Sequence, residues 1–333
     1  MKTKRKNKAL PLIILVVLLA ALLIGYKALS AANDRKAAEE AASLASENAD
    51  TMIAAYDYTT LTSLSYRAQG GDPITLTQSA GVFSYADDAN FPLNQTIAAQ
   101  MANAISQIAV ETTVESGSEA DYGLDNPAYL IEAAYADGTK HVYKIGNYNA
   151  FNGAYYFSMD GTMYMISSGL IPYFQYTEED LLALDTIPAS DWRDTSYIGE
   201  ITVTNGDKSC TISDDAGKTE VIGAIGAFRL SDCADYYADA DEKAAFGLDG
   251  SVSAAVKYKK AVTSTDESGN QSTSYLETTY TLLIGHAAQD GTGYYVSPQK
   301  SNIVYLVDEE TVLALLAYAE YVPAPAEDAL TEG

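Results

Sequence analysis

The sequence contains a short signature that occurs twice, and this repeat constrains the fold more than any other feature. Gly-Leu-Asp occurs at residues 123–125 and again at 247–249, and Ile-Gly and then Tyr-Tyr follow each time. The signature residues are Gly123, Leu124, Asp125, Gly146, Tyr155 and Tyr156 in the first copy, and Gly247, Leu248, Asp249, Gly285, Tyr294 and Tyr295 in the second. From the glycine of Ile-Gly to the first tyrosine is nine positions in both copies. This agreement predicts a duplicated supersecondary unit.

Each part of the signature has a structural explanation. Glycine allows a left-handed or closely packed turn, leucine can fill a core, and aspartate can accept backbone N–H bonds in an Asx turn. Ligand binding by this loop is the alternative. Because side chains alternate along a strand, each Tyr-Tyr pair sends one ring to the core and one outward. We expect the outward rings to contact a partner.

At 333 residues, 47% of them hydrophobic, the chain is long enough for two domains with cores of their own. We predict an α+β fold of two similar tandem modules, residues 58–187 and 195–321. Each is mainly antiparallel sheet with a covering helix.

The first module is predicted from alternating apolar residues and turn signals. Asn94 precedes a helix with Ile97, Met101 and Ile105 on one face, and Asp-Gly pairs at 137 and 160 predict tight hairpins. The predicted strands are Leu61–Tyr66, Ile74–Thr77, Val82–Tyr85, Ala128–Ala136, Lys140–Ile145, Tyr155–Ser158 and Met163–Ile166. Glu178–Leu184 is expected to be a short helical stretch.

The second module repeats this plan with an insertion. Thr219–Phe228 takes the covering-helix position, although Gly223 and Gly226 weaken it. The interval from Gly247 to Gly285 is 15 residues longer than the interval from Gly123 to Gly146. Because Thr263–Ser274 is polar, the extra residues indicate an exposed hairpin extension. The predicted strands are Tyr197–Thr204, Lys208–Ser213, Val252–Lys260, Leu276–Ile284, Tyr294–Ser297 and Ile303–Val307, and Glu309–Tyr321 is predicted to be a helix.

The N-terminal segment is typical of a membrane anchor. Residues 1–8 form a basic tail, and Ala9–Tyr26 carries no charge. These 18 residues would extend about 27 Å as a helix, close to the bilayer core. We predict a transmembrane helix at 9–29 with a cytoplasmic N-terminus, so that the rest lies outside the cell. A signal peptide cleaved near Ala28–Ala32 is the alternative.

Two further segments connect and end the chain. Residues 33–57 are rich in alanine and glutamate, with apolar residues three and four apart, and are predicted to form a helical stalk. Residues 322–333 are predicted to be a disordered tail.

Charge and cysteine content limit the partners. The net charge is −25, although the basic tail contributes five positive charges. So acidic a chain repels phosphate backbones, which excludes nucleic acid as a partner. Cys210 and Cys233 are too few for a disulfide scaffold and are not spaced as a zinc site. They pair with each other or remain two buried thiols.

The sequence contains no motif for catalysis or for a cofactor. There is no nucleophile elbow, zinc-binding helix, phosphate-binding loop or dinucleotide fingerprint. The only histidines, His141 and His286, stand at non-equivalent positions, and neither has an Asp or Cys partner evident in the sequence. Acidic clusters at Asp87–Asp88, Asp214–Asp215 and 235–242 lack the pattern of a calcium loop. We therefore predict a protein that is not an enzyme and needs no metal or cofactor.

The signature resembles the bacterial family catalogued as domain of unknown function 4340. The residues that carry the resemblance are Tyr122–Pro127 in the first copy; the second copy differs, with Phe246 and Ser251 in place of the tyrosine and proline. The resemblance implies a membrane-anchored, outward-facing protein beside ABC-type permease and ATPase components similar to those of gliding machinery. The implied function is a non-enzymatic accessory or binding subunit. The alternative is a stand-alone envelope protein that binds cell-wall glycan or another extracellular ligand through some of its 26 tyrosines.

Overall fold

The computed structural model describes residues 51–265 and 269–322, and in this range it is mainly β-structure with few helices. The strands form three antiparallel sheets, which is compatible with the predicted α+β class. The chain divides into two compact units, one from residues 51–75 and 99–175 and the other from 76–98 and 176–322.

The first sheet has eight strands in the order β4-β3-β2-β7-β8-β9-β10-β6. In chain order they are β2 (Leu61–Ala68), β3 (Ile74–Ser79), β4 (Val82–Tyr85), β6 (Thr112–Thr113), β7 (Tyr129–Tyr135), β8 (Lys140–Asn149), β9 (Ala154–Met159) and β10 (Thr162–Ser167). The hairpin between β9 and β10 turns on Asp160 and Gly161, whose φ angles are 52° and 88°. Two positive φ angles match the right-handed twist of the paired strands, so this Asp-Gly dipeptide fixes the register.

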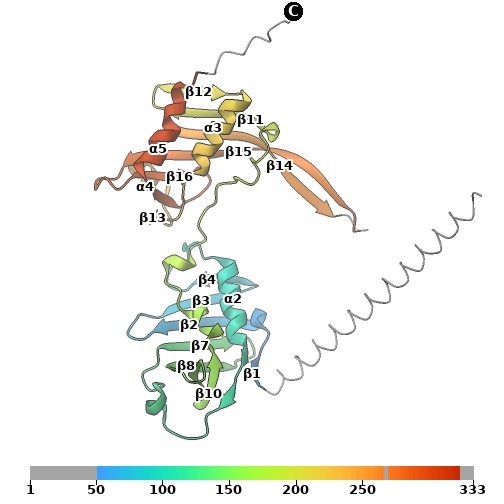
Figure 1. Ribbon diagram of the computed structural model, residues 1–333, viewed down its shortest axis with the longest axis vertical. Helices are drawn as coiled ribbons and strands as arrows, with labels where there is room; N and C mark the ends of the chain where they lie inside the picture. The colour runs from blue at the N-terminus through green and yellow to red at the C-terminus, as the bar shows by residue number, and fades with distance from the viewer. Residues whose placement is uncertain (1–50, 266–268, 323–333) are drawn as a thin grey trace, which may run out of the picture. The chain divides into compact units, whose positions relative to one another are not determined.

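Helix α2 (Gln95–Ser106) lies against the first sheet (Figure 1). Asn94 caps it, because its side-chain Oδ1 accepts the backbone N–H groups of Thr96 and Ile97. Met101 and Ile105 are fully buried, as their shared helix face predicts. Four short 3-10 helices accompany this part of the chain: η1 (Tyr58–Thr60), η2 (Glu119–Tyr122), η3 (Ser168–Phe174) and η4 (Glu179–Leu181).

The end of the predicted stalk is a strand and not a helix. β1 (Met52–Ala55) pairs antiparallel with β5 (Gln107–Ala109) in a two-stranded sheet. Met-Ile-Ala-Ala suits either structure locally, and the pairing with a strand more than fifty residues away decides between them. Residues 33–50 of the predicted stalk, the basic tail, the predicted span at 9–29 and residues 323–333 lie outside the described residues.

The second sheet has seven strands in the order β12-β11-β14-β15-β16-β17-β13. In chain order they are β11 (Ile198–Asn205), β12 (Lys208–Ile212), β13 (Cys233–Asp235), β14 (Val252–Thr265), β15 (Gln271–Ala287), β16 (Tyr294–Pro298) and β17 (Val304–Val307). Helix α4 (Ala240–Ala245) and the 3-10 helices η5 (Thr195–Tyr197) and η6 (Ala317–Glu320) complete this part.

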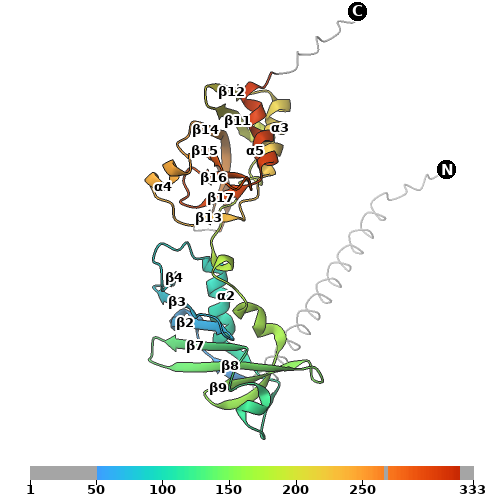
Figure 2. The same ribbon diagram turned by 90° about the vertical axis from the view of Figure 1, so that its left-hand side faces the viewer.

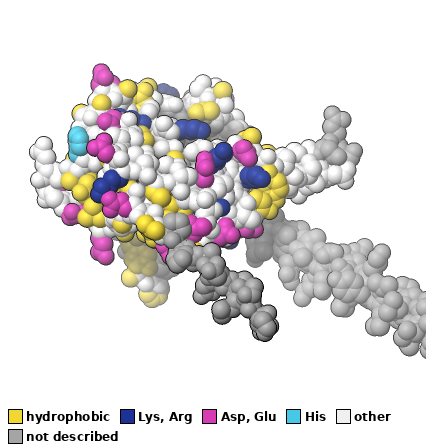
Figure 3. All heavy atoms as spheres, turned by 90° about the horizontal axis from the view of Figure 1, so that it is seen from above, with side chains coloured by type: hydrophobic (Ala, Val, Ile, Leu, Met, Phe, Trp, Pro, Cys, Tyr) yellow, Lys and Arg dark blue, Asp and Glu magenta, His cyan; other side chains and the backbone are white. Residues whose placement is uncertain are grey.

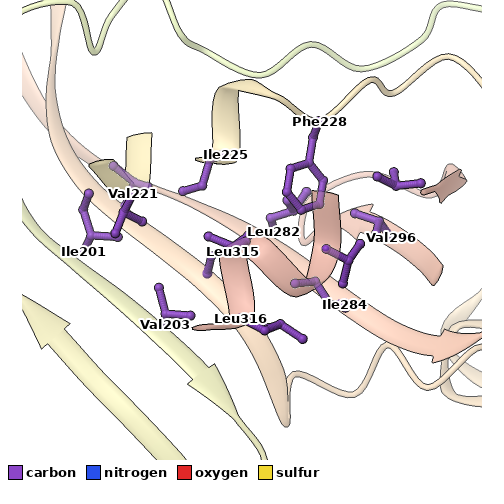
Figure 4. Close-up of a cluster of buried hydrophobic side chains, with 14 of the residues drawn as sticks. Ile201, Val203, Val221, Ile225, Phe228, Leu282, Ile284, Val296, Leu315 and Leu316 are labelled. Atoms are coloured by element: carbon purple, nitrogen blue, oxygen red, sulfur yellow. The ribbon is translucent and has the colours of Figure 1, made fainter. Parts of the chain in front are cut away.

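Two helices, α3 (Asp215–Gly226) and α5 (Glu309–Leu316), lie side by side on one face of the second sheet (Figure 2). Val221, Ile225 and Leu315 of these helices pack on strand residues such as Val203 and Ile284 (Figure 4). Each fully buried aliphatic side chain of this kind contributes about 1.5–3 kcal/mol by leaving water. The core that these side chains form holds the strands that carry the second signature.

β14 and β15 are longer than their neighbours and continue beyond the sheet as a two-stranded ribbon (Figure 1). β11 pairs with β14 only as far as Tyr258, and β16 pairs with β15 only from Leu282 onward. Within the described chain, the distal parts, residues 259–265 and 271–277, therefore have only each other as strand partners. We call them the arm. The predicted hairpin extension is present, and its strands are longer than predicted.

No helix of residues 51–265 and 269–322 is long and apolar enough to cross a bilayer. On the face shown in Figure 3, acidic and basic side chains are interspersed among polar and hydrophobic ones. That face shows no broad patch of a single sign of charge.

Candidate functional site

The first signature is built around a left-handed glycine. The 3-10 helix η2 (Glu119–Tyr122) begins at a capping box of Ser118 and Asp121 and ends at Gly123, whose φ is 72°. The next residue, Leu124, is fully buried. A side chain on Gly146 would place its Cβ 2.3 Å from the carbonyl oxygen of Tyr122, so only glycine fits there.

The second signature has the same construction. Helix α4 begins at a capping box of Asp239 and Glu242 and leads to Gly247, whose φ is 78°. Leu248 is buried, and a Cβ on Gly285 would lie 2.1 Å from the carbonyl oxygen of Phe246. Neither η2 nor α4 was predicted from the sequence, although a capping residue followed three positions later by an acid precedes each signature and could have indicated them.

The Ile-Gly step produces a β-bulge at both signatures. The register shifts between Ile145 and Tyr148 on β8, and between Ile284 and Ala287 on β15. In each case one extra residue is accommodated beside the glycine, and its side chain lies over the left-handed glycine of the same signature. That residue is Asn147 in the first signature and His286 in the second.

The two tyrosines of the second pair separate as strand alternation predicts. Tyr294 packs against the main core of the second sheet, whereas Tyr295 packs with Phe246 against a smaller cluster. In the first pair, Tyr156 stacks on Tyr122 with ring centroids 4.3 Å apart, and Tyr155 lies 5.0 Å from Tyr148. All four tyrosines of the pairs are partly exposed.

The two signature aspartates differ. Asp249 accepts the backbone N–H of Ser251 at 2.8 Å, which is the Asx turn that the sequence predicts. The bonds from Ser251 hold the pKa of the Asp249 carboxyl below its usual value. Asp125 is exposed in the corresponding loop. The aspartate thus has a structural role in at least the second signature.

A groove of about 500 Å³ lies beside the second signature. Phe246, Tyr295 and Leu306 give it an apolar, partly exposed floor. The other side chains that line it are mostly polar and exposed, and they include His286, Asp232, Asp290, Gln289 and Thr292. Residues from four different strands and loops meet here, and the sequence drew attention to three of them, Phe246, His286 and Tyr295, for separate reasons.

His141 has the acidic partner that the sequence did not reveal. Its Nδ1 lies 2.7 Å from Oδ2 of Asp160, and its Nε2 lies 2.7 Å from the hydroxyl of Tyr56. The ring of Tyr135 packs against that of Tyr56 with centroids 4.6 Å apart, and its hydroxyl lies 3.0 Å from Oγ of Ser106. Asp160 begins the turn between β9 and β10, and its carboxylate lies beside β8, where Oδ1 accepts the backbone N–H of Val142 at 2.9 Å.

The electrostatics of this cluster favour an ionised Asp160. Burial opposes ionisation, but bonds from the Val142 N–H and from His141 outweigh it and lower the pKa of the carboxyl. Burial also raises the pKa of Tyr135 and of Tyr143. An aspartate, a histidine and a phenol in line can relay a proton, yet His141 is 9% exposed, and its ring is packed among Tyr56, Tyr135 and Tyr143. The geometry serves to attach Tyr56, which follows β1, to the first sheet.

Cys210 and Cys233 are both free thiols. Cys210 lies on β12 and Cys233 on β13, the two opposite edge strands of the second sheet. Adjacent strands are about 4.8 Å apart, so six strand spacings separate the cysteines, far beyond the reach of a disulfide. Burial raises the pKa of the Cys233 thiol, and the nearby carboxylates of Asp235 and Asp232 raise it further, to about 11. Of the two alternatives for the cysteines, the structure contains the free thiols.

The acidic clusters act mainly as caps. Asp214 accepts the Gly217 N–H at the start of α3, and Asp239 accepts the N–H groups of Asp241 and Glu242 at the start of α4. Within residues 51–265 and 269–322, no three His, Cys, Asp or Glu side chains are grouped as metal ligands would be. Carboxylates at helix N-termini satisfy backbone donors that would otherwise be unpaired.

Comparison with known protein families, with curated proteins and with solved structures gives no match.

Proposed function

We propose that the chain is a non-enzymatic extracytoplasmic binding subunit of a membrane complex, of the ABC-type transport class that its signature resembles. In this proposal residues 58–187 and 195–321 are two tandem α+β modules, held at the membrane by the segment at 9–29. The tandem organisation is supported by the shared capping box, left-handed glycine, buried leucine and glycine bulge. The partners are a permease and ATPase, with other envelope subunits.

The arm is the single observation that carries a binding function. Its outer backbone edges have no strand partner within the described chain, and such edges accept a strand from another protein. Val262 and Leu276 on it are 41% and 61% exposed. Leu276 faces Lys260 across the ribbon and Val262 faces Ser274, so both apolar side chains lie on one face. A protein partner would bury this face and pair with an edge.

The arm is also held in a defined direction. Tyr275 stacks on Tyr197 with ring centroids 5.0 Å apart and 18° between the rings, and their hydroxyls lie 3.0 Å apart. Because Tyr197 belongs to η5, this contact ties the arm to the start of β11. A ribbon that is already oriented loses less conformational entropy when it binds.

Co-purification tests the proposal. The full chain carries an affinity tag and is isolated from its native membranes in mild detergent, once unchanged and once with Val262→Asp and Leu276→Asp. We expect the unchanged chain to bring down permease and ATPase subunits. The double variant should bring down about tenfold less of them, since two charges replace the apolar contacts that the partner would bury.

Phe151→Asp is the matched control, because Phe151 is 96% exposed in the turn between β8 and β9. It should leave the co-purified subunits unchanged. Recovery of the same transport subunits with the double variant would contradict the role of the arm. A chain that brings down no membrane subunit would contradict the proposed function itself, and binding to purified cell-wall glycan would then favour the stand-alone alternative.

A further inference from the structure

We infer that the groove beside the second signature binds a small organic cation, an amine or guanidinium group seated against Phe246 and Tyr295 between the carboxylates of Asp232 and Asp290. This site is separate from the arm and goes beyond the proposed binding of membrane subunits. It would give the chain a ligand of its own.

The floor of the groove presents aromatic faces. The rings of Phe246 and Tyr295 lie 4.6 Å apart at 56°, so neither ring covers the face of the other. At the first signature, Tyr122 and Tyr156 instead stack at 28° and occupy each other's faces. An exposed aromatic face carries the negative side of the ring quadrupole, which attracts a cation within about 6 Å.

The backbone around the groove is held firmly. The N–H of His286 donates to the carbonyl of Phe246 at 2.9 Å, and the N–H of Leu306 donates to the carbonyl of Asp232 at 2.9 Å. The imidazole of His286 fills the space that Gly247 leaves open. Together with the pairing of β15 with β16 and of β16 with β17, these bonds join four segments into one surface, so the site is formed before any ligand arrives.

The charge of the groove is negative. Both bonds from Thr292 to Asp290 are accepted by Oδ1, at 3.1 Å from the backbone N–H and 2.7 Å from the hydroxyl, which leaves Oδ2 for a ligand. These bonds hold the pKa of Asp290 below its usual value, so the carboxylate is ionised at neutral pH. The residues that line the groove include two aspartates and no lysine or arginine.

A cation suits this lining better than a neutral ligand. A neutral sugar could stack on the rings, but it would take water from two carboxylates without returning charge, which costs free energy. A cation compensates for that cost by direct attraction to the carboxylates, and the net charge of −25 raises the local concentration of the cation. Because the rim is open to solvent, this attraction weakens as salt increases.

The test uses the full chain in a polyoxyethylene detergent, whose head group is neither a sugar nor a cation. Agmatine, which carries a guanidinium and an amine, is titrated calorimetrically beside N-butylurea, which has a planar polar head group without charge. We expect saturable binding of agmatine, weaker at about 0.5 M than at about 0.05 M salt, and no saturable binding of N-butylurea.

Variants assign the binding to the groove. One variant combines Asp232→Asn and Asp290→Asn, both at exposed positions, and another carries Tyr295→Leu. Each should weaken agmatine binding about tenfold. Tyr156→Leu at the first signature and the arm variant Val262→Asp with Leu276→Asp should leave it unchanged. The inference fails if agmatine does not bind to the folded chain or if the aspartate variant binds it equally well. It also fails if N-butylurea, or the neutral sugar chitotriose titrated in the same way, binds as tightly.

Discussion

The two signatures have the same backbone but different surroundings for their aromatic rings. In the first, the hydroxyl of Tyr122 donates to the carbonyl of Ser116 at 2.7 Å, and Asn149 donates to the hydroxyl of Tyr156 at 3.1 Å. In the second, Phe246 has no hydroxyl to bond, and Tyr295 borders the groove. Glycine and leucine hold each site together, whereas the aromatic positions decide whether the rings stack on each other or border a groove.

The largest expected effect comes from the bulge glycines. Gly146→Ala and Gly285→Ala would each press a Cβ against a backbone carbonyl, which cannot move aside as a side chain can. We expect each to lower the free energy of unfolding by about 4 kcal/mol, measured by urea denaturation. If only one of the two variants lowered the free energy of unfolding, the two signatures would not be structurally equivalent.

Gly223→Ala is the control for these glycines. Gly223 lies inside α3 without a positive φ, and a Cβ there would meet no atom within 4 Å. Alanine should therefore stabilise the helix, by about 0.5–1 kcal/mol. Destabilisation by this change would show that alanine is harmful at glycines of this chain for reasons other than close approach.

The carboxylate of Asp160, which bonds His141 near the first signature, makes stability depend on pH. Asp160, which bonds His141, has a lowered pKa in the folded chain, so its contribution to stability is present above its usual value of 3.8 and is lost as the pH falls through the folded value. Asp160→Asn should cost about 1.5 kcal/mol at pH 7 and should flatten the decline of stability below about pH 4. Denaturation midpoints from pH 7 to pH 2 measure this, and an unchanged slope would rule out Asp160 as the titrating group.

The smallest effect concerns the ring hydroxyl that distinguishes the signatures. Tyr122→Phe copies the second signature into the first and removes the bond to Ser116, which should cost about 1 kcal/mol. Phe246→Tyr, the reverse change, should have little effect on stability because its ring borders an open groove. Thermal melting of both variants checks the pair, and equal losses would mean that the two ring environments are alike.

Local signals in the sequence predicted much of the fold. Asn94 marks the start of α2, and the Asp-Gly pair at 160 sets the hairpin of β9 and β10. These features depend on residues a few positions apart, which is why they can be predicted from the sequence. Met52–Ala55 was predicted to be helical and is a strand, because its partner, β5, lies far along the chain.

The candidate sites were harder to predict for the same reason. The groove brings together Asp232, Phe246, His286 and Tyr295, and no local pattern connects them. Asp160 was recognised as a turn residue, but its bond to His141 depends on the pairing of β8 with the hairpin that follows. Predicting these sites needs the strand register, which the bulges at the two signatures shift by one residue.

The length of β15 has a practical consequence for protein engineering. The strand begins in the arm and ends at the bulge beside the groove, so an odd number of residues removed from it would turn every following side chain to the opposite face. A shortened or grafted arm must therefore lose facing residues of β14 and β15 together, in steps of two. If this rule is followed, the arm can be exchanged for another hairpin, and its outer end can be redesigned without changes to the sheet that supports it.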